Sequence, residues 1–205
     1  MSDAEPKRPK RRLDHRLIVA LVPPRSHVLD LGCGDGWLLE ELILQKGCRG
    51  RGIDIDEQAV RACIRRGVPV YHGDMMEGMA HYRDGTFDVV ILSQTLQQTH
   101  RPVEVIHEML RVGRTAIISF PNFGYWQVRL QLLLTGRMPR TDLLPYAWYD
   151  TPNVHLCTIT DFREMCDREG LIRVREIFVR APAHRISPWG ANWRANLAIF
   201  QVCKA

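Results

Sequence analysis

The chain has 205 residues and a mass of 23.6 kDa, with 45% apolar residues, 25% charged residues and a formal net charge of +5. These values predict a single folded domain with one sizeable core, and they exclude a chain that is disordered along its whole length. The longest apolar runs, such as residues 89–92, are far too short to span a bilayer.

Six cysteines stand at positions 33, 48, 63, 157, 166 and 203, and no two of them form a Cys-X-X-Cys pair. The sequence also lacks a His-Glu-X-X-His motif, so it predicts no metal site. The cysteines are sparse, and the first sixteen residues contain no apolar stretch that could act as a secretory signal. We therefore expect a protein of the reducing cytoplasm.

Positive charge is concentrated at the start of the chain. Residues 1–16 hold six Lys or Arg and three acids, which gives this segment +3 of the total of +5. Such a segment can bind nucleic acid, but no aromatic side chains are interleaved for stacking on bases. We expect a mobile basic tail over residues 1–16, and we expect neither nucleic acid nor a membrane as partner.

Short apolar runs alternate with amphipathic stretches over the first 120 residues, which predicts strands that alternate with helices. The strands are expected at 27–31, 51–54, 68–71, 87–92 and 115–120. The helices are expected at 37–45, from the cap residue Asp56 to Gly67 with Val60, Cys63 and Ile64 on one face, and from Pro102 to Gly113. This alternation is typical of an α/β protein with a doubly wound sheet.

The last third of the chain changes character. Residues 125–134 are expected to be helical, and 136–157 form a long loop with three prolines, three aromatic residues and no clear period. Thr158 and Asp161 have the spacing of a capping box, which predicts a helix that ends at Gly170. Two further strands are expected at 173–179 and 197–202.

The strongest motif is VLDLGCGDG at residues 28–36, directly after the first strand. Glycines 32, 34 and 36 would allow a tight turn into a helix and a close approach of the backbone to a ligand. Their spacing differs from the Gly-X-Gly-X-X-Gly of nicotinamide dinucleotide sites. Asp30 and Asp35 flank the turn, where they would repel a phosphate and attract a cation. The alternative is a strand–helix turn that binds nothing.

Asp54 lies at the expected end of the second strand, 18 residues after Gly36. A carboxylate at that place can accept hydrogen bonds from both ribose hydroxyls. Because Asp56 is the expected helix cap, Asp54 is left over for a ligand. The alternative is an acid that only marks the end of the strand.

Asp74 follows the third strand in the segment Gly73-Asp74-Met75. Its carboxylate could accept a hydrogen bond from an adenine amine, while Met75 and Ile55 cover the faces of the ring. Taken alone, Gly73-Asp74 is typical of a simple turn. The functional interpretation depends on its place after the other two elements.

These three elements in this order resemble the class I S-adenosylmethionine-dependent methyltransferases over residues 27–120. The resemblance implies a Rossmann-like sheet of seven strands with an antiparallel last strand, in a single methyltransferase-like domain over residues 17–205. It implies S-adenosylmethionine or S-adenosylhomocysteine as the cofactor. The methionine part of the cofactor would face Asp30, Gly32, Cys33, Gly34, Asp35 and Gly36. The ribose would contact Asp54, and the adenine would contact Ile55, Asp74 and Met75. Ser93 and Gln94 would border the sulfonium and the acceptor site.

A second resemblance covers most of the chain. The stretches 92–99 (LSQTLQQT), 108–114 (EMLRVGR), 119–126 (SFPNFGYW), 129–134, 136–139 and 144–158 (LPYAWYDTPNVHLCT) are similar to the MetW methionine-biosynthesis family. Tyr125 is a departure, because a histidine is expected at that position. The resemblance implies a role in making methionine and a partnership with a homoserine O-acetyltransferase or O-succinyltransferase.

No clear catalytic base follows the fourth strand. Residues 93–98 supply hydroxyls and amides, which can orient a substrate but cannot take a proton near neutral pH. His100 is expected at a helix entrance, and His155 is the candidate base by residue type. Core packing, partner contact and substrate contact all stay open for Asn122, Trp126, Tyr146, Trp148, Tyr149, Asp150, Asn153, Trp189 and Trp193.

Two functional hypotheses follow. In the first, the chain is a cofactor-binding accessory subunit of the acyltransferase, and cofactor binding reports methionine status. In the second, it is a methyltransferase that acts on an unidentified small molecule, positioned by Gln94, Gln97 and His155. A nucleic-acid methyltransferase is a third hypothesis that rests only on the basic tail.

Overall fold

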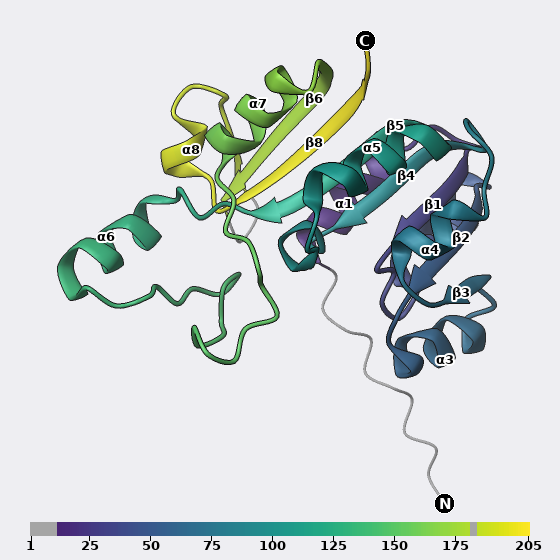
Figure 1. Cartoon of the computed structure of the whole chain (residues 1–205), viewed down its shortest axis with the longest axis horizontal. Helices are drawn as coiled ribbons and strands as arrows, with labels where there is room; N and C mark the ends of the chain where they lie inside the picture. Colours follow the sequence, from purple (N-terminus) through teal and green to yellow (C-terminus); the bar gives the residue numbers. More distant parts are fainter. Residues whose placement is uncertain (1–11, 181–183) are drawn as a thin grey trace, which may run out of the picture.

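The structure is a computed structural model that describes residues 12–180 and 184–205. In these residues eight strands form one sheet in the order β3-β2-β1-β4-β5-β8-β6-β7 (Figure 1). The strands are β1 (His27–Leu31), β2 (Arg49–Asp54), β3 (Val70–His72), β4 (Phe87–Ser93), β5 (Gly113–Pro121), β6 (Leu171–Arg180), β7 (His184–Ile186) and β8 (Leu197–Lys204). The helices are α1 (Leu13–Leu21), α2 (Trp37–Lys46), α3 (Glu57–Arg65), α4 (Met75–Ala80), η1 (Leu96–Gln98), α5 (Pro102–Val112), α6 (Trp126–Thr135), α7 (Ile159–Arg168) and α8 (Ala191–Arg194).

Strand directions confirm the predicted doubly wound sheet with an antiparallel last strand. The five strands β1 to β5 are mutually parallel, and β8 runs antiparallel to both of its neighbours, β5 and β6. The expected number of seven strands is wrong, because the three-residue strand β7 adds an eighth at the edge beside β6. A strand this short carries too little periodicity to be detected in a sequence.

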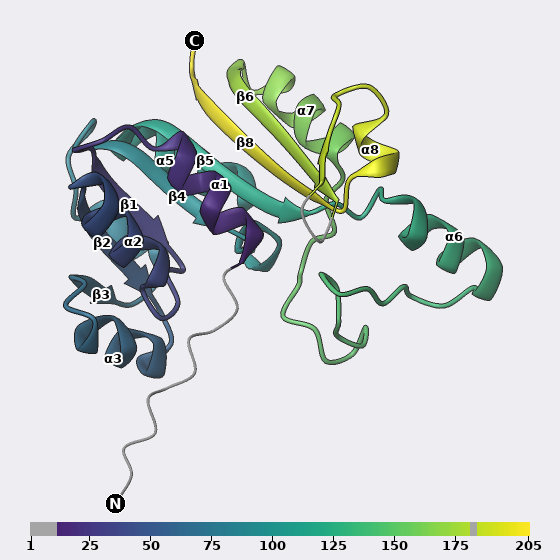
Figure 2. The same cartoon turned by 180° about the vertical axis from the view of Figure 1, so that it is seen from behind.

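Helices cover both faces of the sheet and enclose two cores. Helices α1, α2 and α3 pack on one face, and α4, α5 and α7 pack on the other (Figures 1 and 2). Successive side chains of β4 enter opposite cores. Val89 and Ile91 join the core beneath α1, α2 and α3, and Val90 and Leu92 join the core beneath α4, α5 and α7. Burial on both faces explains why the central strands have continuous apolar sequences.

The beginning of the chain differs from the expected tail over residues 1–16. Residues 1–11 lie outside the described residues, and helix α1 begins at Leu13. Ile18 and Val22 are almost fully buried against the sheet, so this segment belongs to the fold. In α3, Val60 and Cys63 are buried as predicted, but Ile64 is 64% exposed and does not share their face.

Local end signals confirm several predicted boundaries. The Asp56 side chain caps α3 by accepting hydrogen bonds from two backbone N–H groups, and Thr158 and Asp161 form the predicted capping box of α7. The stretch 136–157 contains no helix or extended strand, apart from one bridge between Thr141 and Leu144. No helix among the described residues is long and apolar enough to cross a membrane.

Candidate functional site

The site lies at the C-terminal ends of the parallel strands β1 to β4. Parallel strands that end at one edge leave a crevice where their connecting loops separate, and this is where ligands bind in open α/β sheets. A cavity of about 710 Å³ occupies this place. The residues that line it include Gly32, Asp54, Asp74, Ser93, Gln94 and His100. A smaller pocket of about 230 Å³ adjoins it and shares Arg12, Gly32 and Ser93 with it.

The glycine turn after β1 has the left-handed geometry that its sequence predicts. Gly32, Gly34 and Gly36 have φ angles of 66°, 57° and 77°, which side chains rarely adopt. A Cβ on Gly36 would lie 2.8 Å from the Cys63 sulfur, whereas a Cβ on Gly34 would meet no atom within 4 Å. Gly34 therefore leaves open space beside the turn, and Gly36 is required by close packing against α3.

The Cys33 side chain lies behind the glycine turn, in the core between α2 and α3. It is 8% exposed, and its sulfur lies 3.7 Å from that of Cys63. The Cys63 thiol in turn donates a hydrogen bond to the carbonyl oxygen of Gly34, at 3.2 Å. The Cys33 thiol thus packs in the core against Cys63, which holds the turn, although Cys33 also borders the smaller pocket.

The Asp54 carboxylate, expected to be left over for a ligand, already holds two backbone groups. Its Oδ2 accepts a hydrogen bond from Gly34 N at 2.7 Å, and its Oδ1 accepts one from Asp56 N at 2.9 Å. Asp54 therefore ties the glycine turn to the end of β2. Each carboxylate oxygen has a second lone pair, and Asp54 lines the cavity, so a ribose hydroxyl could still be accepted.

Asp74 is the N-cap of α4, a helix that the sequence did not predict. Its Oδ1 accepts a hydrogen bond from Met76 N at 2.7 Å and a longer one from Glu77 N at 3.4 Å. Asp74 thus caps a helix where the sequence taken alone suggested a simple turn. Asp74, Met75 and the exposed Ile55 nevertheless line the cavity together, as the ligand interpretation requires.

The two acids that flank the glycine turn differ from the expected pair of bare negative charges. Asp35 forms an ion pair with Arg66 at 3.1 Å, and the Arg66 guanidinium lies over the Trp37 ring at 5.1 Å from its centroid. Asp30 is 2% exposed, and burial raises the pKa of its carboxyl to about 8. Repulsion of a phosphate by these two residues is therefore weaker than the sequence suggests.

Three buried polar atoms around the smaller pocket have no hydrogen-bond partner within residues 12–180 and 184–205. They are Oδ1 of Asp30, Nδ1 of His15 and Nε1 of Trp37. Burial, with a further contribution from the charge of Arg12, lowers the pKa of His15, so its ring is neutral near pH 7. Buried polar atoms are almost always paired, and three unpaired ones around one pocket indicate a polar ligand that supplies the missing partners.

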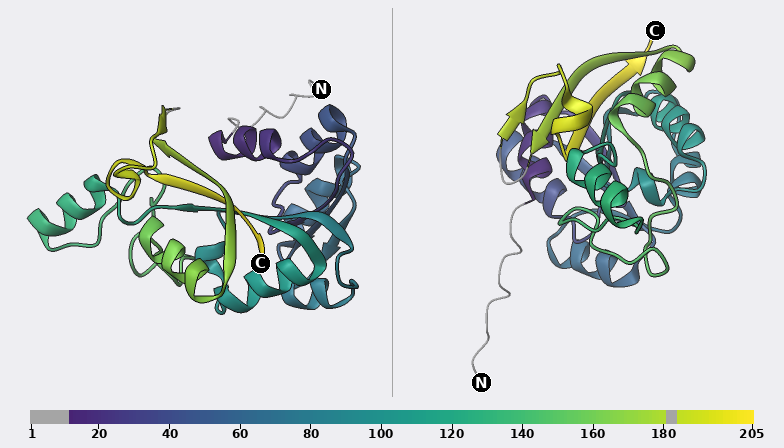
Figure 3. Two further views of the ribbon diagram at one scale, coloured as in Figure 1. Left: turned by 90° about the horizontal axis from the view of Figure 1, so that it is seen from above. Right: turned by 90° about the vertical axis from the view of Figure 1, so that its left-hand side faces the viewer.

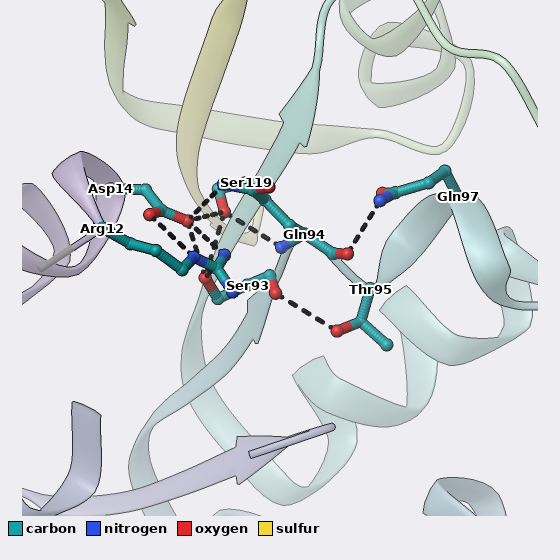
Figure 4. Close-up of polar contacts among 7 residues, drawn as sticks. All are labelled: Arg12, Asp14, Ser93, Gln94, Thr95, Gln97 and Ser119. Carbon is teal, nitrogen blue, oxygen red and sulfur yellow. Dashed lines mark hydrogen bonds and ion pairs between the residues drawn. The ribbon is translucent and has the colours of Figure 1, made fainter. Parts of the chain in front are cut away.

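A buried polar network connects α1 to the ends of β4 and β5 (Figure 4). The Asp14 carboxylate is 1% exposed and accepts hydrogen bonds from Ser93 Oγ at 3.0 Å, Gln94 Nε2 at 2.8 Å and Ser119 Oγ at 3.3 Å. It also forms an ion pair with Arg12 at 2.6 Å. Burial alone would raise the pKa of Asp14, but the hydrogen bond and charge of Arg12, together with contributions from His15 and Gln94, outweigh it and lower the pKa below its ordinary value.

Gln94 is held in a strained backbone conformation, with a φ of 53°. Its N–H donates to the Ser119 carbonyl at 2.9 Å, and its own carbonyl accepts from Gln97 Nε2 at 2.7 Å. Strain of this kind in a non-glycine residue is typical of functional sites. Ser93 and Gln94 line the cavity, and their contact with a ligand stays a prediction. Sequence reasoning missed Arg12, Asp14 and His15, because the composition of residues 1–16 indicated only a basic tail.

The candidates for a catalytic base lie at the rim of the cavity. His100 lines the cavity, and the exposed His155 ring lies 3.4 Å from the His100 carbonyl oxygen. Asn122, by contrast, is 1% exposed and bonds only to backbone groups: it donates to the carbonyls of Asn192 and Ala195 and accepts from Gly124 and Ile159. Its role is therefore structural, and the Tyr146, Trp148 and Tyr149 side chains are exposed at the surface.

Solved structures share this fold. The chain matches an S-adenosylmethionine-dependent methyltransferase from Archaeoglobus fulgidus with a TM-score of 0.66 and 16% identity, covering 93% of this chain and 94% of that one. It matches the [4+2]-cyclase SpnF with a TM-score of 0.62 and 18% identity, covering 93% of this chain and 81% of that one. The second match shows that the fold alone does not establish methyl transfer.

Sequence comparisons give the family. The chain is 37% identical over 175 residues to the bifunctional methionine biosynthesis protein MetXA/MetW of Rhodopirellula baltica, an alignment that covers 81% of this chain and 28% of that protein. It is 34% identical over 103 residues to the ubiquinone biosynthesis O-methyltransferase of Pseudomonas aeruginosa, covering 46% of this chain and 44% of that protein. The chain thus spans less than half the length of these relatives. Residues 12–202 match the family described as methionine biosynthesis protein MetW, and the chain belongs to that family.

Proposed function

We propose that this protein binds S-adenosylmethionine or S-adenosylhomocysteine and acts as an accessory subunit of a homoserine O-acyltransferase in methionine biosynthesis. The observation that carries the cofactor proposal is the group of three unpartnered buried atoms around the pocket beside the glycine turn. They fit the amino-acid end of the cofactor, which carries one ammonium and one carboxylate.

The charges around the smaller pocket suit a zwitterion. Asp30 would accept from the ammonium group of the ligand, and the positive charge would favour the ionised form of this carboxyl. Arg12, with the N–H groups of Trp37 and His15, would hold the carboxylate. When bound, the cofactor would supply an activated methyl group on a positively charged sulfur. No residue has to move a proton for this binding, apart from Asp30 itself.

The larger cavity suits the nucleoside end. Asp54 has lone pairs left for ribose hydroxyls, and Asp74 lies on the same cavity with Ile55 and Met75, whose apolar side chains can cover an adenine ring. The smaller pocket and the larger cavity meet at Gly32 and Ser93, so one elongated ligand could occupy both. This arrangement supports a single binding site for the whole cofactor.

The environment of Ser93 and Gln94 supports an accessory role. The hydroxyl and amide of these residues are bound to the buried carboxylate of Asp14, so they are held in place and cannot take a proton from an acceptor. The name of the Rhodopirellula baltica relative places MetXA and MetW in one protein. This fusion supports a physical partnership between the two activities. Cofactor binding would report methionine status to the partner by its different affinity for two states of the complex.

A methyltransferase that acts on an unidentified small molecule is the second candidate. The observation that favours it is the size of the larger cavity, which at about 710 Å³ extends to His100 and Glu104 beyond the predicted cofactor residues. A neutral histidine at that rim could accept a proton from an acceptor group.

Three assays test these functions. Isothermal titration with S-adenosylmethionine tests the cofactor, and acyltransferase kinetics with and without this chain test the accessory role. We expect tight binding and a change in acyltransferase rate that depends on the cofactor; unchanged kinetics at saturating cofactor would remove the accessory role. Transfer of a radiolabelled methyl group to a metabolite extract would support the second candidate.

A further inference from the structure

Helix α6 and the long loop after it project away from the rest of the molecule (Figures 1 and 3). Residues 126–157 are called the arm below. Val128 is the one buried side chain of α6, and with Tyr125 and Leu144 it forms a small apolar cluster at the base of the arm. This cluster is separate from the two cores on the faces of the sheet. The arm is therefore anchored at its base, and most of its surface is open.

The open surface of the arm is rich in large apolar side chains. Leu133 and Leu134 of α6 are 80% and 73% exposed, and Trp148 and Tyr149 of the loop are 73% and 76% exposed. Other members of this surface are Leu130, Leu132, Met138, Tyr146, Val154 and Leu156. Large apolar side chains left exposed in such number are typical of a surface that another protein covers.

The arm also offers formed recognition features. A groove of about 430 Å³ runs between α6 and residues 140–142, with Leu130, Leu134 and Trp126 in its lining. Its second wall is fixed because Arg140 N donates to the Gln131 side chain at 2.9 Å and Thr141 pairs with Leu144 through the backbone. The Trp148 and Tyr149 rings pack edge to face at 5.6 Å, and exposed aromatic side chains are the residues that most often dominate binding energy at interfaces.

The comparison with the fused relative indicates what covers the arm. An alignment that covers 81% of a 205-residue chain includes residues 126–157 wherever its ends lie, so the MetXA/MetW protein of Rhodopirellula baltica carries this segment beside its MetXA part. The matched region is 28% of that protein, which leaves ample length for a second folded unit. A covalent link keeps two units at high local concentration, which favours a direct interface between them.

We infer that the arm is the docking surface for the homoserine O-acyltransferase, with Trp148, Tyr149 and the exposed leucines of α6 as its anchors. This inference rests on the partnership proposed above and adds where the partner binds. The arm also reaches the rim of the cavity, because Val154 N and His155 N donate to the Gln97 carbonyl at 2.8 and 3.0 Å. Gln97 contacts Gln94, which contacts Asp14, so the docking surface is continuous with the network beside the predicted cofactor.

The test uses the full chain and a purified homoserine O-acyltransferase in isothermal titration and size-exclusion chromatography. The arm variants are Trp148→Ser with Tyr149→Ser, and Leu133→Ser with Leu134→Ser. The matched control is Leu44→Ser with Ile64→Ser, which removes apolar side chains of α2 and α3 that are also mostly exposed, at 77% and 64%. We expect each arm variant to bind the acyltransferase at least tenfold more weakly, and the control to bind as the unaltered chain does.

The outcomes separate the two proposals. If the unaltered chain binds and both arm variants bind equally well, the arm is not the docking surface, although the partnership stands. If the unaltered chain does not bind the acyltransferase at all, the partnership fails and the docking inference fails with it. If the arm variants lose only an association between copies of this chain, detected by sedimentation, the occupant is a second copy and the inference is wrong.

Discussion

Two regions of the molecule, the sheet edge beside the cavity and the arm, use their residues in opposite ways. At the cavity, polar groups are buried and most are committed to one another: Asp14 accepts from three side chains besides its ion pair with Arg12. On the arm, most large apolar side chains are exposed, and Val128 and Leu144 are buried only in the small cluster at its base. Buried polar atoms without partners indicate a small polar ligand, whereas exposed apolar side chains indicate a protein partner. The chain thus has one region suited to a small polar ligand and another suited to a protein partner.

Removal of Asp14 beside the cavity should give the largest loss of stability. Asp14→Ala leaves Ser93, Ser119 and Gln94 without their acceptor and Arg12 without its ion pair. We expect the free energy of unfolding to fall by about 3 kcal/mol, because buried polar groups lose their partners together. Urea unfolding measures this change. The exposed Asp142→Ala should change it by less than about 0.5 kcal/mol, and equal effects of the two substitutions would show that the network is not stabilising.

Gly36→Ala tests the close packing behind the glycine turn. The substitution forces a side chain onto a φ of 77° and places its Cβ 2.8 Å from the Cys63 sulfur. We expect a loss of about 2 kcal/mol in thermal unfolding from backbone strain and overlap. Gly67→Ala is the matched control, since its φ is 73° and no atom lies within 4 Å of the added Cβ. The control should lose only about 1 kcal/mol from backbone strain; a loss as large as that of Gly36→Ala would remove the packing argument.

Asp30→Asn tests whether the buried carboxyl of Asp30 makes stability and cofactor binding depend on pH. Burial raises the pKa of Asp30 from 3.8 to about 8, so its protonated form contributes stability that is complete below about pH 4 and is lost as the pH rises through about 8. The variant should lose this pH dependence of the free energy of unfolding across the same range.

The same residue should make cofactor binding depend on pH. A ligand ammonium favours the ionised carboxylate, so affinity of the unaltered chain for the cofactor should rise from about pH 6 to about pH 8. The variant should bind about tenfold more weakly and without that rise. A variant that retains the pH dependence and the affinity would show that Asp30 does not face the ligand.

The smallest effect is expected on the arm. Trp148→Ser with Tyr149→Ser should change the free energy of unfolding by less than about 0.5 kcal/mol, because both side chains are more than 70% exposed and contribute little to either core. Cofactor titration of the isolated chain should also be unchanged. A clear loss of stability would mean that the aromatic pair packs within the fold, which would remove the contrast between the two regions.

The strands and the glycine turn could be predicted because their signals are local. Continuous apolar runs such as Val89–Leu92 have few alternatives, and a strand followed by three alternating glycines requires a tight turn. Asp56 and Thr158 cap helices within three residues of themselves, so their roles can also be read from spacing. These parts of the fold depend on neighbours in the sequence.

The rest of the site depends on contacts between distant segments. Asp14 meets Ser93 and Ser119, which are 79 and 105 residues away, and the basic composition of the first sixteen residues concealed the helix that carries it. The apolar spacing of Leu17, Ile18 and Leu21 before two prolines was the available signal for that helix. The hydrogen bond from Gly34 to Asp54 is likewise a long-range contact, between the glycine turn and the end of β2, so the sequence alone suggested a free carboxylate.

Isothermal titration of the purified chain with S-adenosylmethionine tests the central claim most directly, with the Arg12→Ala and Asp30→Asn variants beside the unaltered chain. The predicted result is one cofactor bound per chain, with weaker binding in both variants and no binding of a nicotinamide dinucleotide. A chain that binds no S-adenosylmethionine, or that binds the dinucleotide equally well, would contradict the assignment of the pocket beside the glycine turn to the amino-acid end of the cofactor.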